Sequence, residues 1–160
     1  MTCSGGKFHF DDDQETPDTQ LAVFHFGDKA IAWEHRTWHK RGFEGQSWGV
    51  TFYGEQGSLV VTDGKYVVYD MDEKQLEEGS LNNGEIEHQA NFLDCIRSGA
   101  RPNADIEEGV KSTLLCNLGN IAYRTGHTLK LDPTTAQLIG DDEAAALWSR
   151  EYRPGWEPVV

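Results

Sequence analysis

The sequence has little cysteine, little proline and no long hydrophobic run, and each shortage excludes a class of protein. Only three cysteines and five prolines occur among 160 residues. Cys3, Cys95 and Cys116 cannot all pair and show no Cys-x-x-Cys spacing, so we expect reduced thiols rather than a disulfide framework. The apolar runs are far shorter than the roughly 18–20 residues needed to cross a bilayer. We therefore expect no membrane partner.

Basic residues are also scarce. The chain has 14 Lys and Arg against 27 Asp and Glu, which gives a formal net charge of −13. Nucleic acids and anionic membranes are poor partners for such a chain, because binding phosphates requires a basic surface. Hydrophobic residues make up 38% and glycine is abundant, as in an ordinary globular protein. The length predicts a single domain over residues 1–160. We expect it in the cytoplasm, although an export signal upstream of residue 1 stays possible.

The patterning changes once, near residue 80. Before it, β-branched and aromatic residues alternate with polar ones, which predicts strands at Lys7–Phe10, Leu21–Phe26, Ala30–Trp38, Trp48–Tyr53, Ser58–Thr62 and Lys65–Asp70. After it, helical spacing predicts helices at His88–Arg97, Ile106–Tyr123 and Asp142–Arg150, with a returning strand at Thr128–Leu131. Strands followed by helices indicate an α+β fold. We expect an open, mostly antiparallel mixed sheet of about six or more strands with two to three helices packed on one face.

One loop concentrates positive charge in this acidic chain. His39, Lys40 and Arg41 follow Arg36 closely, inside a connection that is long for a hairpin. Such a group attracts an anion, such as a carboxylate or a phosphate. We therefore take Arg36, His39, Lys40 and Arg41 as candidate substrate-binding residues. The alternative is a solvated loop balanced by neighbouring glutamates.

A second mixed aromatic and basic set lies near the end of the chain, with Arg101 as a distant member. It comprises Arg150, Tyr152, Arg153 and Trp156. We expect this tail to dock on its own domain or on a neighbouring subunit.

Other motifs predict no catalytic, cofactor-binding or metal-binding residue in this chain. No Gly-x-Gly-x-x-Gly turn occurs, and Gly109–Thr113 lacks the glycine spacing of a phosphate loop. The acidic run Asp11–Glu15 lacks the sixth-position glycine and the twelfth-position acid of a calcium loop. His35 and His39 would lie about 13 Å apart on a strand, too far to share one metal ion.

Several segments resemble the C-terminal region of the Gfo/Idh/MocA oxidoreductases, which include glucose–fructose oxidoreductase and inositol dehydrogenase. They are Ser4–Asp12, Trp33-Glu34, Phe52–Leu59, His88–Gly99 with Arg101-Pro102, and the tail Trp148–Pro158. The tail is similar to that of a subgroup frequent in planctomycete-type bacteria, so a bacterial source is expected.

The resemblance implies an enzyme of two domains. An N-terminal Rossmann domain would bind NAD(P), and an α+β domain would shape the sugar or polyol site and form a homo-oligomer through its open sheet face. The family's Glu-Lys-Pro and Asp-x-x-x-His catalytic motifs do not occur here; Glu73-Lys74 is followed by Gln75. The resemblance therefore implies a substrate-binding and oligomerisation domain that lacks its nucleotide half and is not catalytic alone.

Two alternatives stay open from the sequence. One is a stand-alone self-associating module without redox activity, in which Trp33, Trp38 or Phe24 would lie on the uncovered face of the sheet. The other is a small-ligand-binding module for calcium or carbohydrate.

Overall fold

The computed structural model describes residues 1–157, apart from the side chain of Phe43. The chain divides into two compact units, and each is described by itself. The first unit comprises Met1–Trp38 and the chain from Val110 onward, and the second comprises His39–Gly109. Pro158, the last residue of the tail motif, lies outside the described residues.

The first unit contains a three-stranded antiparallel sheet. Its strands are β1 (Thr2–Gly6), β2 (Thr19–Phe26) and β3 (Lys29–Arg36), in the order β1-β2-β3. Phe26 pairs with Lys29, so a two-residue turn joins β2 to β3. Gly27 supplies the positive φ that this turn requires.

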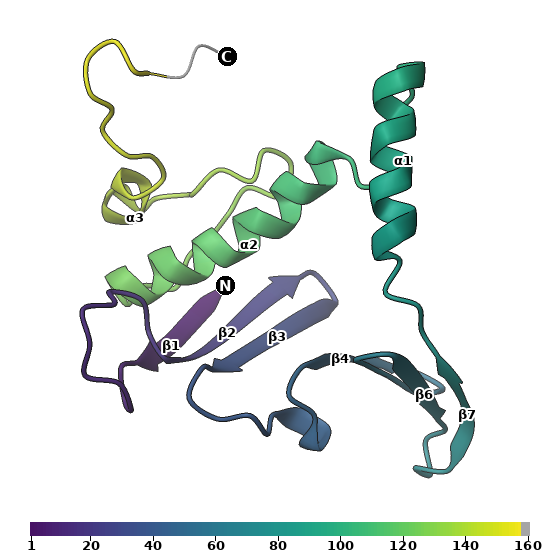
Figure 1. Ribbon diagram of the computed structural model, residues 1–160. Helices are drawn as coiled ribbons and strands as arrows, with labels where there is room; N and C mark the ends of the chain where they lie inside the picture. Colours follow the sequence, from purple (N-terminus) through teal and green to yellow (C-terminus); the bar gives the residue numbers. More distant parts are fainter. Residues whose placement is uncertain (158–160) are drawn as a thin grey trace. The chain divides into compact units, whose positions relative to one another are not determined.

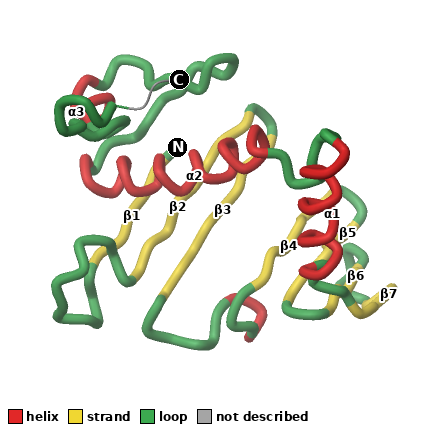
Figure 2. Tube along the Cα trace, turned by 45° about the horizontal axis from the view of Figure 1, so that its top comes forward, coloured by secondary structure: helices red, strands yellow, loops and turns green. Residues whose placement is uncertain are grey.

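One face of this sheet is covered by α2 (Ile106–Thr125), which runs across the strands in Figures 1 and 2. Gln20, Ala22 and Phe24 of β2 are buried while Leu21 between them is exposed, as the alternation of a strand requires. Gln20 Nε2 donates to the carbonyl of Gly119 on α2 at 3.3 Å. The buried face of β2 therefore lies against the helix.

The core of the unit lies at the C-terminal half of α2. It consists of Leu118, Ile121, Ala122, Leu129 and Ala144. The helix predicted at Ile106–Tyr123 is confirmed, but its buried residues lie in its second half, whereas Ile106 and Val110 are exposed. Backbone hydrogen bonds between Met1 and Leu129 tie the start of the chain to this core. The short helix α3 (Asp142–Ala146) is capped at its N-terminus by Asp141, whose side chain accepts a hydrogen bond from the N–H of Ala144.

The second unit is a four-stranded antiparallel meander followed by a helix. The strands are β4 (Gly49–Gly54), β5 (Gly57–Thr62), β6 (Lys65–Tyr69) and β7 (Gln75–Ser80), and the helix is α1 (Glu85–Ser98). Before β4, a short 3₁₀ helix, η1, spans Phe43–Gly45. Thr62 pairs with Lys65, so Asp63 and Gly64 form a two-residue hairpin turn between the strands predicted at Ser58–Thr62 and Lys65–Asp70. Gly99 ends α1 in the left-handed region and donates its N–H to Cys95.

The expected α+β class is confirmed, with seven antiparallel strands and three helices among the described residues. The strands hydrogen-bond as two sheets rather than as the single sheet expected. The prediction of a strand at Lys7–Phe10 was wrong, because the N–H groups of Phe8, His9 and Phe10 bind a carboxylate instead of a neighbouring strand. Thr128–Leu131 contributes one isolated bridge, from Leu131 to Leu138, rather than a strand.

Two elements were missed and one is shorter than expected. The strand β1 was missed because two of its five residues, Gly5 and Gly6, are of the type depleted in strands and the segment shows no apolar alternation. The strand β7 was missed because it carries adjacent glutamates, which are common on an edge strand. The last helix ends at Ala146 instead of Arg150.

The expected aromatic composition of the uncovered face was also wrong. Phe24 is only 6% exposed and lies on the side of the sheet that faces α2. Trp33 pairs with Ala22 and shares that side, although it is itself exposed on the edge strand. Trp38 lies beyond the end of β3. Among the described residues, no helix combines the length and the apolar character needed to span a membrane.

We predict that Leu129→Ala lowers the free energy of unfolding by about 2–5 kcal/mol, because Leu129 is 1% exposed and its truncation leaves a cavity in the core. Urea unfolding followed by circular dichroism measures the change. Ile139→Ala, at a half-exposed position in the same unit, serves as the control and should lose much less. Equal losses in the two variants would contradict the assignment of the core.

Candidate functional site

A buried carboxylate organises the loop that joins β1 to β2. Asp18 is 3% exposed and accepts hydrogen bonds from the backbone N–H groups of Phe8, His9 and Phe10 at 3.1, 2.8 and 3.0 Å. The hydroxyl of Thr19 donates to the same carboxylate at 2.8 Å. Three successive N–H groups on one anion give the loop a single conformation, as in other backbone anion cradles.

These hydrogen bonds also control the protonation of Asp18. Burial by itself raises the pKa of the carboxyl, but the hydrogen bonds from Phe10, His9, Phe8 and Thr19 outweigh it and hold the pKa far below its usual range. The carboxylate therefore stays charged at any pH at which the protein is expected to function.

The ordered loop presents a cluster of aromatic rings. His9 stacks on Trp38 with ring centroids 5.0 Å apart and an interplanar angle of 21°, and Phe10 meets His9 edge-on at 4.9 Å. The indole N–H of Trp38 donates to the hydroxyl of Thr19 at 3.0 Å. The same carboxylate thus holds both residues of the stacked pair, His9 through its backbone N–H and Trp38 through the hydroxyl of Thr19.

The structure places the predicted basic residues in different units. Arg36 ends β3 in the first unit and forms an ion pair with Glu34. His39, Lys40 and Arg41 begin the second unit, where the backbone N–H of Arg41 donates to His39 Nδ1 at 3.1 Å. Lys40 and Arg41 are exposed. His39, Lys40 and Arg41 therefore form one local group, and Arg36 stands apart from it in its contacts.

The loop that carries His39, Lys40 and Arg41, here called the basic loop, is held together by contacts between its own residues. Gly42 donates its N–H to the carbonyl of Gln46 at 2.6 Å, and Arg41 packs against Gly45. Between these residues Glu44 has a φ of +55°, a left-handed conformation that costs free energy for a residue other than glycine.

A small hollow lies between this loop and the strands of the second unit. It has a volume of about 80 Å³ and is lined by Glu44, Gln46, Val60, Thr62, Lys65, Val67 and Tyr69. Carboxylate, amide, ammonium and hydroxyl groups thus meet at one surface. The charge pattern indicates His39, Lys40 and Arg41 of this loop as candidates but does not indicate Glu44, Gln46, Lys65 or Tyr69, because the register that brings the strands under the loop is not visible in the sequence.

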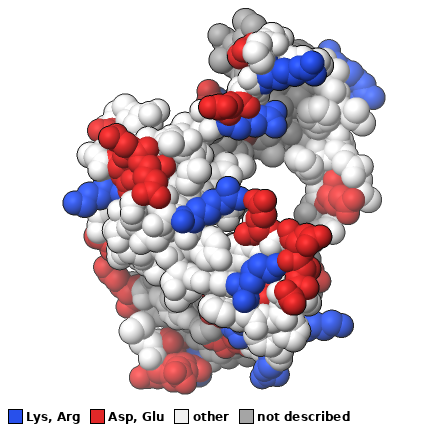
Figure 3. Space-filling model, turned by 90° about the vertical axis from the view of Figure 1, so that its left-hand side faces the viewer, with Lys and Arg blue, Asp and Glu red and all other residues white. Residues whose placement is uncertain are grey.

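The charged side chains on the surface reflect the excess of acidic residues in the sequence. On the face shown in Figure 3, lysines and arginines stand singly or in small groups among acidic and uncharged residues. In the second unit, Arg101 is held by Asp105 at 2.5 Å and by Glu107 at 2.7 Å. The hydrogen bonds from Arg101 and from the N–H of Glu107 lower the pKa of Asp105.

Among the described residues, no three His, Cys, Asp or Glu side chains gather as a metal site.

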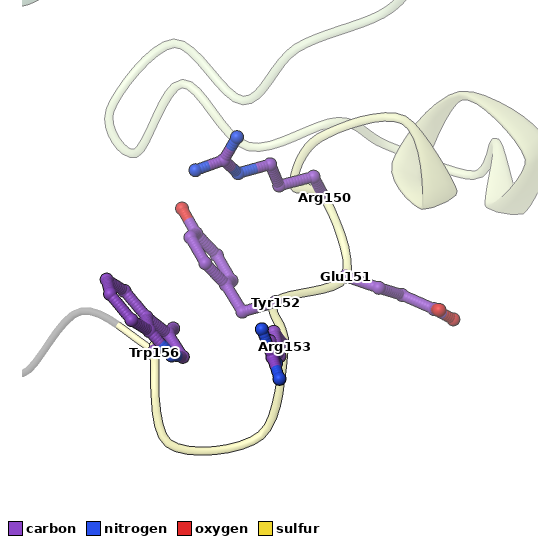
Figure 4. Close-up of a pocket in the computed structure, with 5 residues that line it drawn as sticks. All are labelled: Arg150, Glu151, Tyr152, Arg153 and Trp156. Atoms are coloured by element: carbon purple, nitrogen blue, oxygen red, sulfur yellow. The ribbon is translucent and has the colours of Figure 1, made fainter.

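A second hollow is formed by the tail. It has a volume of about 410 Å³, is open to solvent, and is lined by Arg150, Glu151, Tyr152, Arg153 and Trp156 (Figure 4). The guanidinium of Arg150 lies over the ring of Tyr152, 4.8 Å from its centroid, as a cation–π pair. The chain then turns, with the N–H of Trp156 donating to the carbonyl of Arg153 at 2.9 Å. The expected grouping of these four side chains is observed, whereas Arg101 is occupied by its own ion pairs.

Comparison with protein families identifies the chain. Residues 54–158 match the model of the C-terminal α/β domain of an oxidoreductase family, that of Gfo/Idh/MocA. The chain belongs to this family. The matched range covers most of the second unit together with α2, α3 and the tail.

A solved structure supports the fold of this oxidoreductase-family domain. A protein from Klebsiella pneumoniae, described as an oxidoreductase, superposes with a TM-score of 0.62 at 14% sequence identity. The match covers 91% of this chain but only 45% of the other, so the domain spans less than half the length of that protein. No curated protein matches the sequence.

We predict that Asp18→Asn destabilises the protein at neutral pH, because the amide cannot replace the carboxylate that binds three N–H groups. Since the pKa of Asp18 is lowered by folding, its contribution is present above the unfolded pKa of about 3.9 and is lost as the pH falls toward the folded pKa. The gap in urea midpoint between wild type and variant should therefore narrow in strong acid.

The control for this experiment is Asp63→Asn, at the exposed Asp-Gly turn of the second unit. It should leave the midpoint nearly unchanged at both pH values. A neutral-pH midpoint for Asp18→Asn equal to that of wild type would contradict the role of the carboxylate.

Proposed function

We propose that this chain is the substrate-side and subunit-contact domain of an NAD(P)-dependent oxidoreductase that acts on a sugar or polyol. In this proposal the nucleotide-binding domain belongs to another part of a longer enzyme, and the present domain is not catalytic alone. The observation that carries the proposal is the match of residues 54–158 to the C-terminal domain of the oxidoreductase family. We also predict that this enzyme is bacterial and cytoplasmic and has no nucleic-acid partner.

The described residues do not fit a dinucleotide. Binding of the pyrophosphate requires a Gly-rich turn between a strand and a helix of a parallel βαβ unit. Both sheets here pair antiparallel throughout the described residues, and no Gly-x-Gly-x-x-Gly turn occurs. We therefore assign no step of hydride transfer to a residue of this chain.

The exposed face of α1 supports a longer enzyme. Ile86, Phe92 and Ile96 are 80%, 54% and 65% exposed, and among the residues of this helix only Cys95 is buried. A helix of 14 residues with an uncovered apolar face gains little stability by itself and requires a covering surface. The 45% coverage of the Klebsiella pneumoniae chain leaves ample length for such a covering domain in a protein of this fold.

The basic loop is the part of this chain that we propose to contact substrate. His39, Lys40 and Arg41 provide donors for hydroxyl or anionic groups, and Arg36 is a further candidate at the end of β3. Glu44 lies in the same loop with a strained backbone, which often accompanies binding sites. The hollow beneath the loop adds groups that accept and donate hydrogen bonds.

The uncovered face of the first sheet is the proposed contact between copies. It carries Leu21 and Val23 of β2 opposite Glu34 and Ala32 of β3. Leu21, Val23 and Ala32 form an aliphatic strip beside the ion pair of Glu34 with Arg36, and such a strip suits packing against a second sheet. A self-associating domain without redox activity is the alternative function, and the same face supports it.

Lys40→Ala/Arg41→Ala in the longer enzyme should raise the KM for substrate by about tenfold and change kcat less, because loss of ionic hydrogen bonds weakens binding. Steady-state kinetics measures both constants. Lys74→Ala/Arg97→Ala provides a matched control in the same unit. Unchanged kinetics in the first variant would remove Lys40 and Arg41 from the substrate site.

Leu21→Glu should shift the 160-residue chain from dimer to monomer, because a carboxylate at the centre of the contact would be buried without a partner. Light scattering after gel filtration gives the mass. Glu55→Lys, in the exposed β4–β5 turn, changes charge away from the sheet face and should leave the mass unchanged. A wild-type chain that stays monomeric at high concentration would contradict the proposed contact.

A further inference from the structure

The turn at Arg150–Trp156 has the composition of an interface hot spot. Arg, Tyr and Trp dominate binding energies at protein interfaces, and four of these seven residues are of those types. Trp156 is 73% exposed and Tyr152 is 38% exposed. The turn is also braced, because the N–H of Gly155 donates to Glu157 at 2.8 Å and Arg150 packs on Tyr152. The side chains of Tyr152 and Trp156 therefore lose little conformational entropy when a partner binds them.

The hollow in this turn is poorly built for a small molecule. Small-molecule sites bury most of their ligand, and their walls come from several elements of the fold. Here five residues of one short segment form the whole lining, and Glu151 lies among them. Figure 4 shows Trp156 and Tyr152 on opposite limbs of the turn with open space between them. Such a shape receives a protruding side chain or loop from a protein surface.

Charge identifies the kind of surface that would be bound. The lining contains two arginines and one glutamate, whereas the whole chain has a net charge of −13. Glu151 and Glu157 lie beside the two arginines, so the turn is close to neutral and far less acidic than the chain as a whole. Its arginines can pair with carboxylates on the acidic surface of a second copy of this chain.

One exposed segment matches the turn in both charge and ring content. Asp11, Asp12, Asp13 and Glu15 place four carboxylates within five residues, of which Asp12 pairs with Lys7 and Glu15 pairs with Arg124 of the same chain. Phe8 and Phe10 lie next to them and are 73% and 42% exposed. The Asp18 carboxylate holds the neighbouring residues 8–10 in place. Arginines facing carboxylates and Trp156 facing phenylalanines would satisfy both kinds of side chain.

We propose that the tail turn Arg150–Trp156 is a docking arm that binds the acidic aromatic segment Phe8–Glu15 of a second copy of this chain. This contact is distinct from the sheet-face contact proposed above, and it does not depend on the enzymatic assignment. The affinity of this contact depends on salt, because its charged groups lie at an exposed rim. The affinity of the sheet-face contact, which packs aliphatic side chains, does not.

Sedimentation velocity of the 160-residue chain over a range of concentrations tests the proposal. Trp156→Ala and Arg150→Glu/Arg153→Glu should each weaken association at low salt by at least about tenfold, and high salt should weaken association of the wild type. Trp48→Ala removes an exposed tryptophan of the second unit, which is 60% exposed, and Lys74→Glu/Arg97→Glu makes the same charge change elsewhere. Neither control should alter association.

A charge exchange makes the test specific. Asp11→Arg/Asp13→Arg should weaken association alone and restore it when combined with Arg150→Glu/Arg153→Glu. Tail variants that associate as the wild type does, or a combined variant without recovery, would overturn the proposal. If Leu21→Glu abolishes association while the tail variants do not affect it, the sheet-face contact stands and the docking arm is refuted.

Discussion

The packing of the C-terminal half of α2 against β2 is the contact on which the first unit depends. Gly119 and Ala122 bring the helix close to the sheet, where Gln20 reaches the carbonyl of Gly119 and Ala22 and Phe24 are buried. This contact decides which face of the three-stranded sheet is covered. It thereby leaves Leu21 and the other alternate residues of β2 on the opposite face, which is the face proposed for contact between copies.

Sequence patterns predicted the elements whose signals are local. The alternation along β2, the Asp63-Gly64 turn and the glycine that ends α1 all act within a few residues, and the strands and the helix that they bound lie close to their predicted positions. The strand wrongly predicted at Lys7–Phe10 involves a group that is distant in sequence. Phe8 alternates with Phe10 as in a strand, yet the carboxylate of Asp18 ten residues away takes its N–H group. No local pattern reports that competition.

The candidate site also combines residues with a local sequence signal and residues that only the fold brings together. Lys40 and Arg41 are candidates because they concentrate charge, whereas no local pattern points to Lys65 and Tyr69, which line the hollow from a different hairpin. The tail stands out because its aromatic and basic residues are adjacent in sequence.

The central claim is that this chain shapes a substrate site and subunit contacts without holding the dinucleotide. Isothermal titration of the 160-residue chain with NAD⁺, NADH, NADP⁺ and NADPH tests it most directly, with the longer enzyme that contains the domain titrated in parallel. The account predicts no heat of binding for the chain alone and saturable binding of one nucleotide by the longer enzyme. Saturable binding of any of the four nucleotides by the 160-residue chain would contradict it.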